Sequence, residues 1–185
     1  MSSVPSSPVF SAFRILNRVS VRQAYGFVVS LVIGLLGFGL YLQHVVGLEP
    51  CPMCIVQRYL LVTAGIAALV GLASGHGWQE RKIRRLAVPS FMGIFSLLGA
   101  WVAARQSLLQ YEARNNPFAE CGPGIEYLIE MHGFSDAMPF IFKGSGDCAA
   151  VDWTFLGLSI ANWSLLNFVF LFLIAIAIGW KSRKA

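Results

Sequence analysis

The sequence predicts an all-α integral membrane protein, a bundle of four transmembrane helices with a long outward loop between the third and fourth helices. Hydrophobic residues make up 56% of the 185-residue chain and charged residues only 12%, against about 25% charged residues in soluble domains. Four apolar runs are long enough to cross a membrane, since about 20 helical residues span the hydrocarbon core. Little sequence remains for a soluble core, so we expect a single membrane domain over 1–185.

The apolar runs alternate with short polar connections. We expect helices at 25–48, 55–73, 86–104 and 156–180. We expect the connections at 49–54, which holds a cysteine pair, at 74–85, which is basic, and at 105–155, with tails at 1–24 and 181–185. The first run follows basic residues, as in a signal peptide, but it exceeds the usual length of about 7–15 apolar residues and lacks a small-residue cleavage site. We therefore expect it to be retained as the first helix.

The distribution of basic residues predicts the orientation. Ten of the fourteen Lys and Arg residues fall on one side of the predicted bundle: Arg14, Arg18, Arg22, Arg81, Lys82, Arg84, Arg85, Lys181, Arg183 and Lys184. The positive-inside rule assigns that side to the cytoplasm. Both tails are then cytoplasmic, and all four cysteines lie on or near the outer face, which in a bacterial-type cell is the oxidising compartment where disulfides persist. This topology accounts for the net charge of +5, so a nucleic-acid partner is not needed.

Cys51 and Cys54 form a pair at the start of the second predicted helix. Pro50 and Pro52 flank Cys51, and proline suits the first turn of a helix, where its missing N–H would have no partner anyway. Free N–H groups and the positive dipole end of a helix stabilise a thiolate, the attacking species in disulfide exchange. A disulfide between them would close only a small ring and constrain the unfolded chain little. The spacing favours a redox-active pair over a structural disulfide.

Arg58 lies four residues after Cys54 inside an apolar run. This spacing places both side chains on one helix face. A charge at mid-bilayer costs about 2.5–3.5 kcal/mol on insertion scales and by default indicates function, although an arginine near a helix end also reaches the headgroups by snorkelling. We favour a functional role, in which the guanidinium holds negative charge and polarises a carbonyl acceptor. The adjacent Gln57 is interpreted as an ordinary polar residue near a helix end.

Cys121 and Cys148 form a second pair in the long outward loop. A disulfide across a loop of this size gives about 3–4 kcal/mol on the chain-entropy model, so on its own the pair is interpreted as structural. A second, redox-active pair on the same side of the membrane changes this interpretation. Both pairs together indicate electron transfer through disulfides.

The chain resembles the DsbB family of bacterial inner-membrane thiol oxidases from the first predicted helix to the start of the fourth. The order and spacing of the motifs carry this resemblance: Gln43-His44-Val45, Pro50-Cys51-Pro52-Met53-Cys54 with Arg58, Pro117-Phe118-Ala119-Glu120-Cys121, Ser145-Gly146-Asp147-Cys148, Trp153 and Phe155-Leu156-Gly157-Leu158.

The resemblance implies a relay of electrons to a membrane quinone, ubiquinone or menaquinone. A periplasmic thioredoxin-like oxidase (DsbA) would give its electrons to the loop pair, with Cys121 forming the mixed disulfide. Cys148 would exchange with Cys51, and Cys54 would contact the quinone, held in part by Arg58. As we align the chain, Arg105-Gln106 stands where the family often has a histidine beside the quinone. Gln106 is therefore a candidate to hydrogen-bond a quinone oxygen, although it carries neither a proton nor a charge.

Four alternatives stay open at this point. A vitamin K epoxide reductase-like enzyme places its loop cysteines before the helix-end pair, the reverse of the order here. A scaffold with two structural disulfides predicts that the helix-end pair resists mild reductant. A transporter is little supported, because the chain has no internal repeat. Zinc requires four ligands, and the three histidines are scattered: His44, His76 and His132.

Overall fold

Four long helices and one short hairpin make up the computed structural model, which describes residues 20–48, 50–73, 82–115, 151 and 153–184. The helices are α2 (Val21–His44), α3 (Pro52–Ala73), α4 (Lys82–Asn115) and α7 (Ile160–Lys184), and the hairpin strands are β1 (Thr154–Phe155) and β2 (Leu158–Ser159). Each of the four helices is long and apolar enough to cross a membrane. The predicted fold class, a four-helix membrane bundle, is confirmed.

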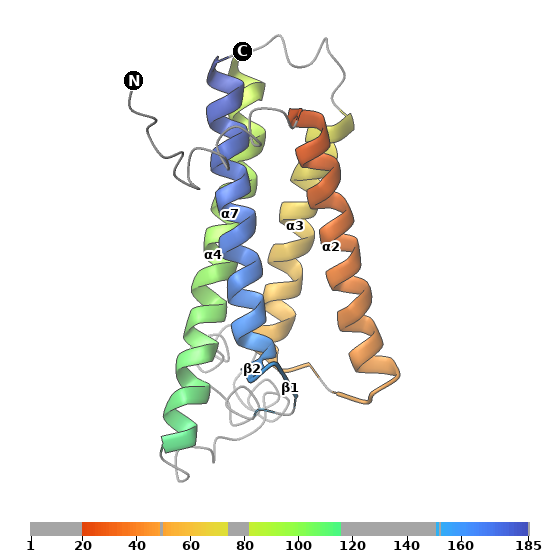
Figure 1. Ribbon diagram of the computed structural model, residues 1–185, viewed down its shortest axis with the longest axis vertical. Helices are drawn as coiled ribbons and strands as arrows, with labels where there is room; N and C mark the ends of the chain where they lie inside the picture. The colour runs from red at the N-terminus through yellow and green to blue at the C-terminus, as the bar shows by residue number, and fades with distance from the viewer. Residues whose placement is uncertain (1–19, 49, 74–81, 116–150, 152, 185) are drawn as a thin grey trace, which may run out of the picture.

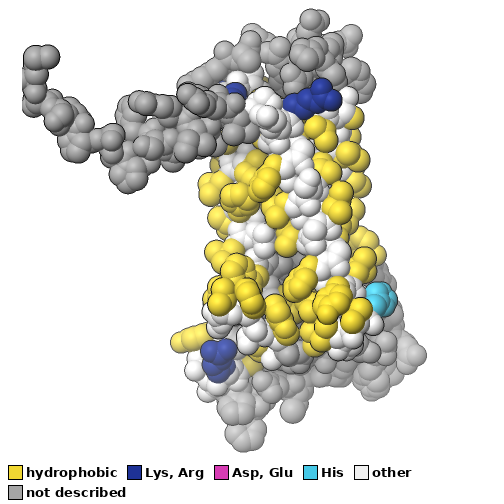
Figure 2. All heavy atoms as spheres, turned by 45° about the vertical axis from the view of Figure 1, so that its right-hand side comes forward, with side chains coloured by type: hydrophobic (Ala, Val, Ile, Leu, Met, Phe, Trp, Pro, Cys, Tyr) yellow, Lys and Arg dark blue, Asp and Glu magenta, His cyan; other side chains and the backbone are white. Residues whose placement is uncertain are grey.

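The helices lie side by side and alternate in direction (Figure 1). The principal packing partners are α4 with α7, α3 with α4, and α2 with α3. The end of α2, the start of α3, the end of α4 and the start of α7 all lie at the lower end of the bundle in Figure 1, where the hairpin also lies. On the face drawn in Figure 2, hydrophobic side chains are spread along most of the length of the helices, with Lys and Arg near the two ends. Exposed large hydrophobic side chains occur on all four helices. The apolar exterior is the surface that a lipid environment requires.

The first and last helices are displaced from their expected positions. Ser20 caps α2, because its hydroxyl accepts from the backbone N–H of Gln23 while the Gln23 side chain accepts from the Ser20 N–H. This capping box starts the helix before the expected residue 25. The helix ends at His44, before the expected residue 48, and Gly47 follows with a φ of +80°.

Residues 154–159, which we expected in part to begin the fourth helix at 156, form the hairpin instead. Its turn needs left-handed backbone at Leu156 and Gly157, with φ of 53° and 78°. That conformation excludes both residues from an α-helix. Helix α7 therefore starts at Ile160 and continues to Lys184, past the expected end at 180.

Helix α4 shows the largest departure. It was expected over 86–104 and runs over Lys82–Asn115, so the segment 105–115 is helical rather than part of the outward loop. The apolar run ends at Arg105-Gln106, but the residues that follow include the strong helix formers Leu, Gln, Glu, Ala and Arg. The extension places Gln106 on a rigid element at the level of the cysteine pair.

Small residues bring the helices close together along the core. A side chain at Gly71 would meet the ring of Tyr25, one at Gly65 would meet Val32, and one at Gly99 would meet the ring of Phe168. Buried side chains from all four helices form the surrounding core: Val28, Val32, Ala64, Ala68, Met92 and Leu171. Close packing of this kind drives helix association in lipid, where apolar burial alone does not.

Candidate active site

Cys51 caps the N-terminus of α3, and Cys54 lies in its first turn. The carbonyl oxygen of Cys51 accepts from the N–H of Ile55, and its sulfur accepts from the N–H of Cys54 at 3.3 Å. Sulfur thus takes the place of the side-chain oxygen that usually caps a helix. Pro52 occupies the first helical position, where its missing N–H has no consequence. The two Sγ atoms lie 2.7 Å apart, close enough for a small movement to join them in a disulfide.

Two buried amide side chains lie against this pair. Gln106 of α4 donates from Nε2 to Cys51 Sγ at 3.2 Å and to Cys54 Sγ at 3.3 Å. Gln57 of α3 donates from Nε2 to the Oε1 atom of Gln106 at 2.7 Å. The exposed fractions are 3% for Gln106 and 5% for Gln57. The sulfurs are thus held between the start of α3 and one residue of α4.

Arg58 points from α3 towards α2. Its guanidinium donates to Gln43 Oε1 at 2.6 Å and to the carbonyl oxygen of Gly39 at 3.2 Å. A Cβ at Gly39 would lie 3.5 Å from the guanidinium, at ordinary van der Waals distance, so the two groups are close neighbours. The charge is thereby held inside the bundle, near the cysteine level, by neutral acceptors of a neighbouring helix.

A cavity of about 630 Å³ opens beside the cysteines and is lined by all four helices and the hairpin. Cys51, Cys54, Arg58 and Gln106 all contribute to its wall. Much of the rest is apolar, including Leu35, Leu36, Phe38, Leu42, Leu61 and Phe168. The cavity therefore combines an apolar interior with two sulfurs, an amide and a cation.

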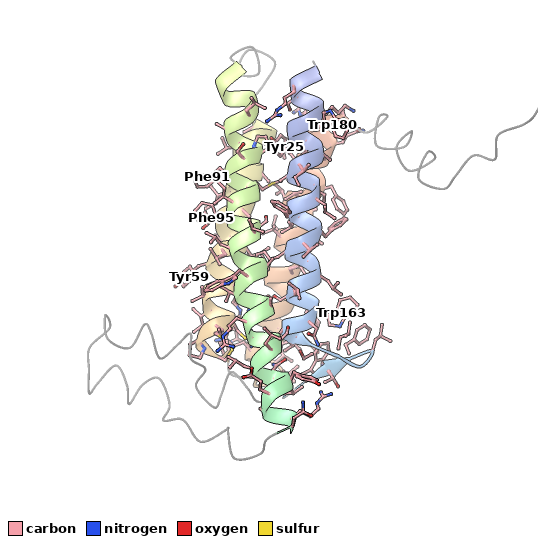
Figure 3. All side chains as sticks on the ribbon, turned by 90° about the vertical axis from the view of Figure 1, so that its left-hand side faces the viewer. Tyr25, Tyr59, Phe91, Phe95, Trp163 and Trp180 are labelled. Atoms are coloured by element: carbon pink, nitrogen blue, oxygen red, sulfur yellow. The ribbon has the colours of Figure 1, made fainter. Side chains whose placement is uncertain are left out.

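The hairpin forms an aromatic wall on the side of the cavity facing α7. Trp163 donates from its ring nitrogen to the carbonyl oxygen of Phe155 at 3.0 Å, and the rings of Trp153 and Phe155 are stacked 5.9 Å apart. Trp153 also meets Phe38 of α2 edge-on at 5.9 Å. Figure 3 shows Trp163 at the hairpin end, with Tyr25 and Trp180 towards the opposite end. This wall links α2 to α7 across the cavity.

A second polar contact lies on the α4–α7 side, one turn nearer the end of α4 than Gln106. The Ser159 hydroxyl donates to Gln110 Oε1 at 2.6 Å and accepts from the N–H of Asn162 at 3.4 Å. Ser159 therefore caps α7 and joins it to α4. Both Ser159 and Gln110 are buried and line the cavity.

Four of the residues singled out from the sequence meet at this cavity: Cys51, Cys54, Arg58 and Gln106. Cys121 and Cys148 lie outside the described residues. Sequence reasoning missed Gln57, which contacts Gln106, and treated Gln43 only as part of a motif, not as the partner of Arg58. Both are amide side chains inside apolar helices. Buried polar groups in a bundle need hydrogen-bond partners, so this position in the sequence could have marked both residues as members of the site.

Comparison with known proteins gives a consistent result. The sequence profile described as "Disulfide bond formation protein DsbB" matches residues 21–178. A curated disulfide bond formation protein B from Azoarcus sp. (strain BH72) is 52% identical over 134 residues, covering 72% of this chain and 77% of the relative. The protein of the same name from Aromatoleum aromaticum is 48% identical over 164 residues, covering 89% and 95%. No solved structure matches significantly. The chain belongs to the DsbB family of disulfide bond formation proteins.

Proposed function

We propose that this protein is a membrane thiol:quinone oxidoreductase that reoxidises a periplasmic thioredoxin-like oxidase (DsbA) and so supports disulfide formation in exported proteins. The observation that carries the proposal is the position of the Cys51–Cys54 pair in the wall of an apolar cavity within a membrane bundle. A dithiol pair beside such a cavity is placed to exchange electrons with a lipid-soluble acceptor.

The residues present fit a quinone. The volume of about 630 Å³ falls in the range of about 300–1,000 Å³ usual for small-ligand sites, and apolar walls with a few polar groups are typical of them. Bound there, a quinone would supply an acceptor for two electrons and two protons. Arg58 and Gln106 are the residues that we assign to the ring, Arg58 as a hydrogen-bond donor and Gln106 as a contact in the wall beside the sulfurs.

The chain's own residues then have distinct tasks. Cys54, within the first turn of α3, is the sulfur that would face the quinone as a thiolate, stabilised by the helix N-terminus. The guanidinium of Arg58 places positive charge near the developing negative charge of an acceptor oxygen. The apolar side chains and the aromatic wall exclude water, which strengthens both electrostatic interactions.

The loop cysteines would connect this site to the protein partner. The partner's dithiol reduces the Cys121–Cys148 disulfide through a mixed disulfide at Cys121 and leaves with its own disulfide formed. The Cys148 thiolate then attacks Cys51, the Cys51–Cys54 bond breaks, and Cys54 leaves as a thiolate. Cys121 next displaces Cys51 and re-forms the loop disulfide. Each exchange moves two electrons with one bond broken and one formed.

We infer that the protein lies in the bacterial inner membrane with the cysteine end towards the periplasm and both termini in the cytoplasm. Arg22, Lys181 and Arg183 stand at the end of the bundle opposite the cysteines. The positive-inside rule assigns that end to the cytoplasm, which supports the orientation.

The proposal is tested with the purified protein in detergent, a reduced thioredoxin-like periplasmic oxidase and a soluble quinone. We expect the quinone absorbance to fall with time and the partner to become oxidised in equal amount. The Cys54→Ser variant should abolish both. A wild-type protein that turns over neither ubiquinone nor menaquinone analogues, although its cysteines form disulfides, would overturn the proposal in favour of a scaffold with structural disulfides.

A further inference from the structure

Gln106 presents its donor end to both sulfurs at once. Its Nε2 lies 3.2 Å from Cys51 Sγ and 3.3 Å from Cys54 Sγ, and a side-chain NH₂ group has two hydrogens and no acceptor. Cys54 Sγ also donates to the Oε1 atom of Gln106, over the longer distance of 3.9 Å. Each sulfur therefore faces an N–H group of the same amide.

Gln57 determines which end of Gln106 faces the sulfurs. Its Nε2 donates to Gln106 Oε1 at 2.7 Å. If the Gln106 amide turned by half a turn while Gln57 stayed in place, the NH₂ groups of the two side chains would face each other. The oxygen of Gln106 would then point at the sulfurs. Because both side chains are almost fully buried, such a mismatch between two donors is costly.

This arrangement distinguishes between the two redox states of the pair. Reduction of the disulfide breaks the S–S bond and takes up two electrons and, when one sulfur stays ionised, one proton. The negative charge exists only in the reduced state, and a hydrogen bond to an ionised acceptor is about twice as strong as one between neutral groups. Donors fixed on both sulfurs therefore stabilise the reduced pair more than the disulfide, whichever sulfur carries the charge.

We propose that Gln106 is a catalytic residue that acts on the sulfurs and raises the reduction potential of the Cys51–Cys54 couple, and that Gln57 is the positioning residue that orients it. The inference deepens the proposed function and rests on it in one respect, that the pair cycles between disulfide and dithiol. A higher potential makes the pair a better acceptor of electrons from the loop cysteines.

The test measures the reduction potential of the pair alone. Full-length protein carrying Cys121→Ser and Cys148→Ser is equilibrated in glutathione buffers, and the reduced fraction is counted by alkylation and mass spectrometry. We expect Gln106→Leu to lower the equilibrium constant for reduction about tenfold, the effect of one hydrogen bond to a charged group, or about 30 mV for two electrons. Gln106→Glu should lower it further, because a carboxylate only accepts and repels a thiolate. Gln57→Leu should lower it by less.

Ser107→Ala is the matched control. Ser107 lies next to Gln106 on α4, and its hydroxyl donates to the carbonyl oxygen of Ala103 at 3.0 Å, so the potential should stay at the wild-type value. Wild-type potentials in Gln106→Leu and Gln106→Glu would overturn the inference, as would an equal shift in Ser107→Ala. If Gln106→Leu does not fold, Gln106→Glu and Gln57→Leu decide by the same criterion. No quinone takes part in this measurement. Unchanged potentials in the variants would therefore overturn this inference without affecting the proposed turnover of quinone. A protein that fails to turn over quinone would still have a measurable potential.

Discussion

Replacing Arg58 by methionine removes the cation from the cavity while keeping an unbranched side chain of similar length. The guanidinium carries five N–H donors, and its bonds to Gln43 and the Gly39 carbonyl use two of them, which leaves donors for a ligand oxygen. A hydrogen bond from a charged donor contributes about 1.5–3 kcal/mol. Since about 1.4 kcal/mol corresponds to a factor of ten, the apparent KM for quinone should rise about 10- to 150-fold.

The assay follows quinone absorbance at several quinone concentrations, with a reduced thioredoxin-like oxidase in excess. Arg58→Lys keeps the charge but loses the planar fork, so its KM should lie between those of the wild type and Arg58→Met. Gln43→Leu leaves the charge in place and removes one neutral partner, so a rise of roughly fivefold is expected, from about 1 kcal/mol.

Exchange with the protein partner is measured separately, by trapping the mixed disulfide. That step should be unchanged in Arg58→Met, because the guanidinium contacts α2 and not the cysteines. An unchanged KM for quinone in a folded Arg58→Met protein would refute the assignment of Arg58 to the ligand. Equal losses in quinone use and partner exchange would indicate a structural role instead.

Three further predictions concern the loop pair, the core and the first helix. Cys121→Ala should abolish capture of the partner, whereas Cys148→Ala, mixed with the partner in its disulfide form, should accumulate a mixed disulfide visible on a non-reducing gel, since Cys121 can attack that disulfide; no trapped species in either would reassign the loop pair. Gly99→Ala should lower stability by about 1–3 kcal/mol in thermal unfolding, because its Cβ would overlap the Phe168 ring; Gly37→Ala, with open space around it, should be neutral or stabilising. Ser20→Ala should increase hydrogen exchange in the first turn of α2 by about fivefold, from loss of a cap of about 1 kcal/mol.

The four spans were predictable because bilayer thickness sets a minimum apolar length that few other structures imitate. Helix ends were less predictable. Hydropathy indicates where a chain leaves the lipid, but the backbone hydrogen bonds of a helix can continue beyond that point. The segment after Ala104 is the example, because α4 continues as a helix to Asn115. Leu156 shows the opposite case. It is apolar and was expected to begin the fourth helix, but it lies in the turn of the hairpin.

Within the site, Cys51, Cys54 and Arg58 were predictable because each residue type is unusual at its position. Gln106 was singled out only through the family resemblance, and as a ligand for a quinone. Its contact with the sulfurs depends on the register between α3 and α4, which a single sequence does not encode locally. Gln57 was missed for the same reason, because one glutamine near a helix end has no distinctive spacing.

The bundle packs differently along its length, and this difference explains why the cavity lies at one end. In the half away from the cysteines, Gly71 admits the ring of Tyr25 and Gly65 admits Val32, so α2 and α3 approach closely. Near the cysteines, Phe38 and Trp153, which precedes the hairpin, meet across the space between α2 and α7. Small-residue packing associates helices in lipid without help from apolar burial. The packed half can therefore hold the helices in register, while the other half leaves room for a ligand beside the sulfurs.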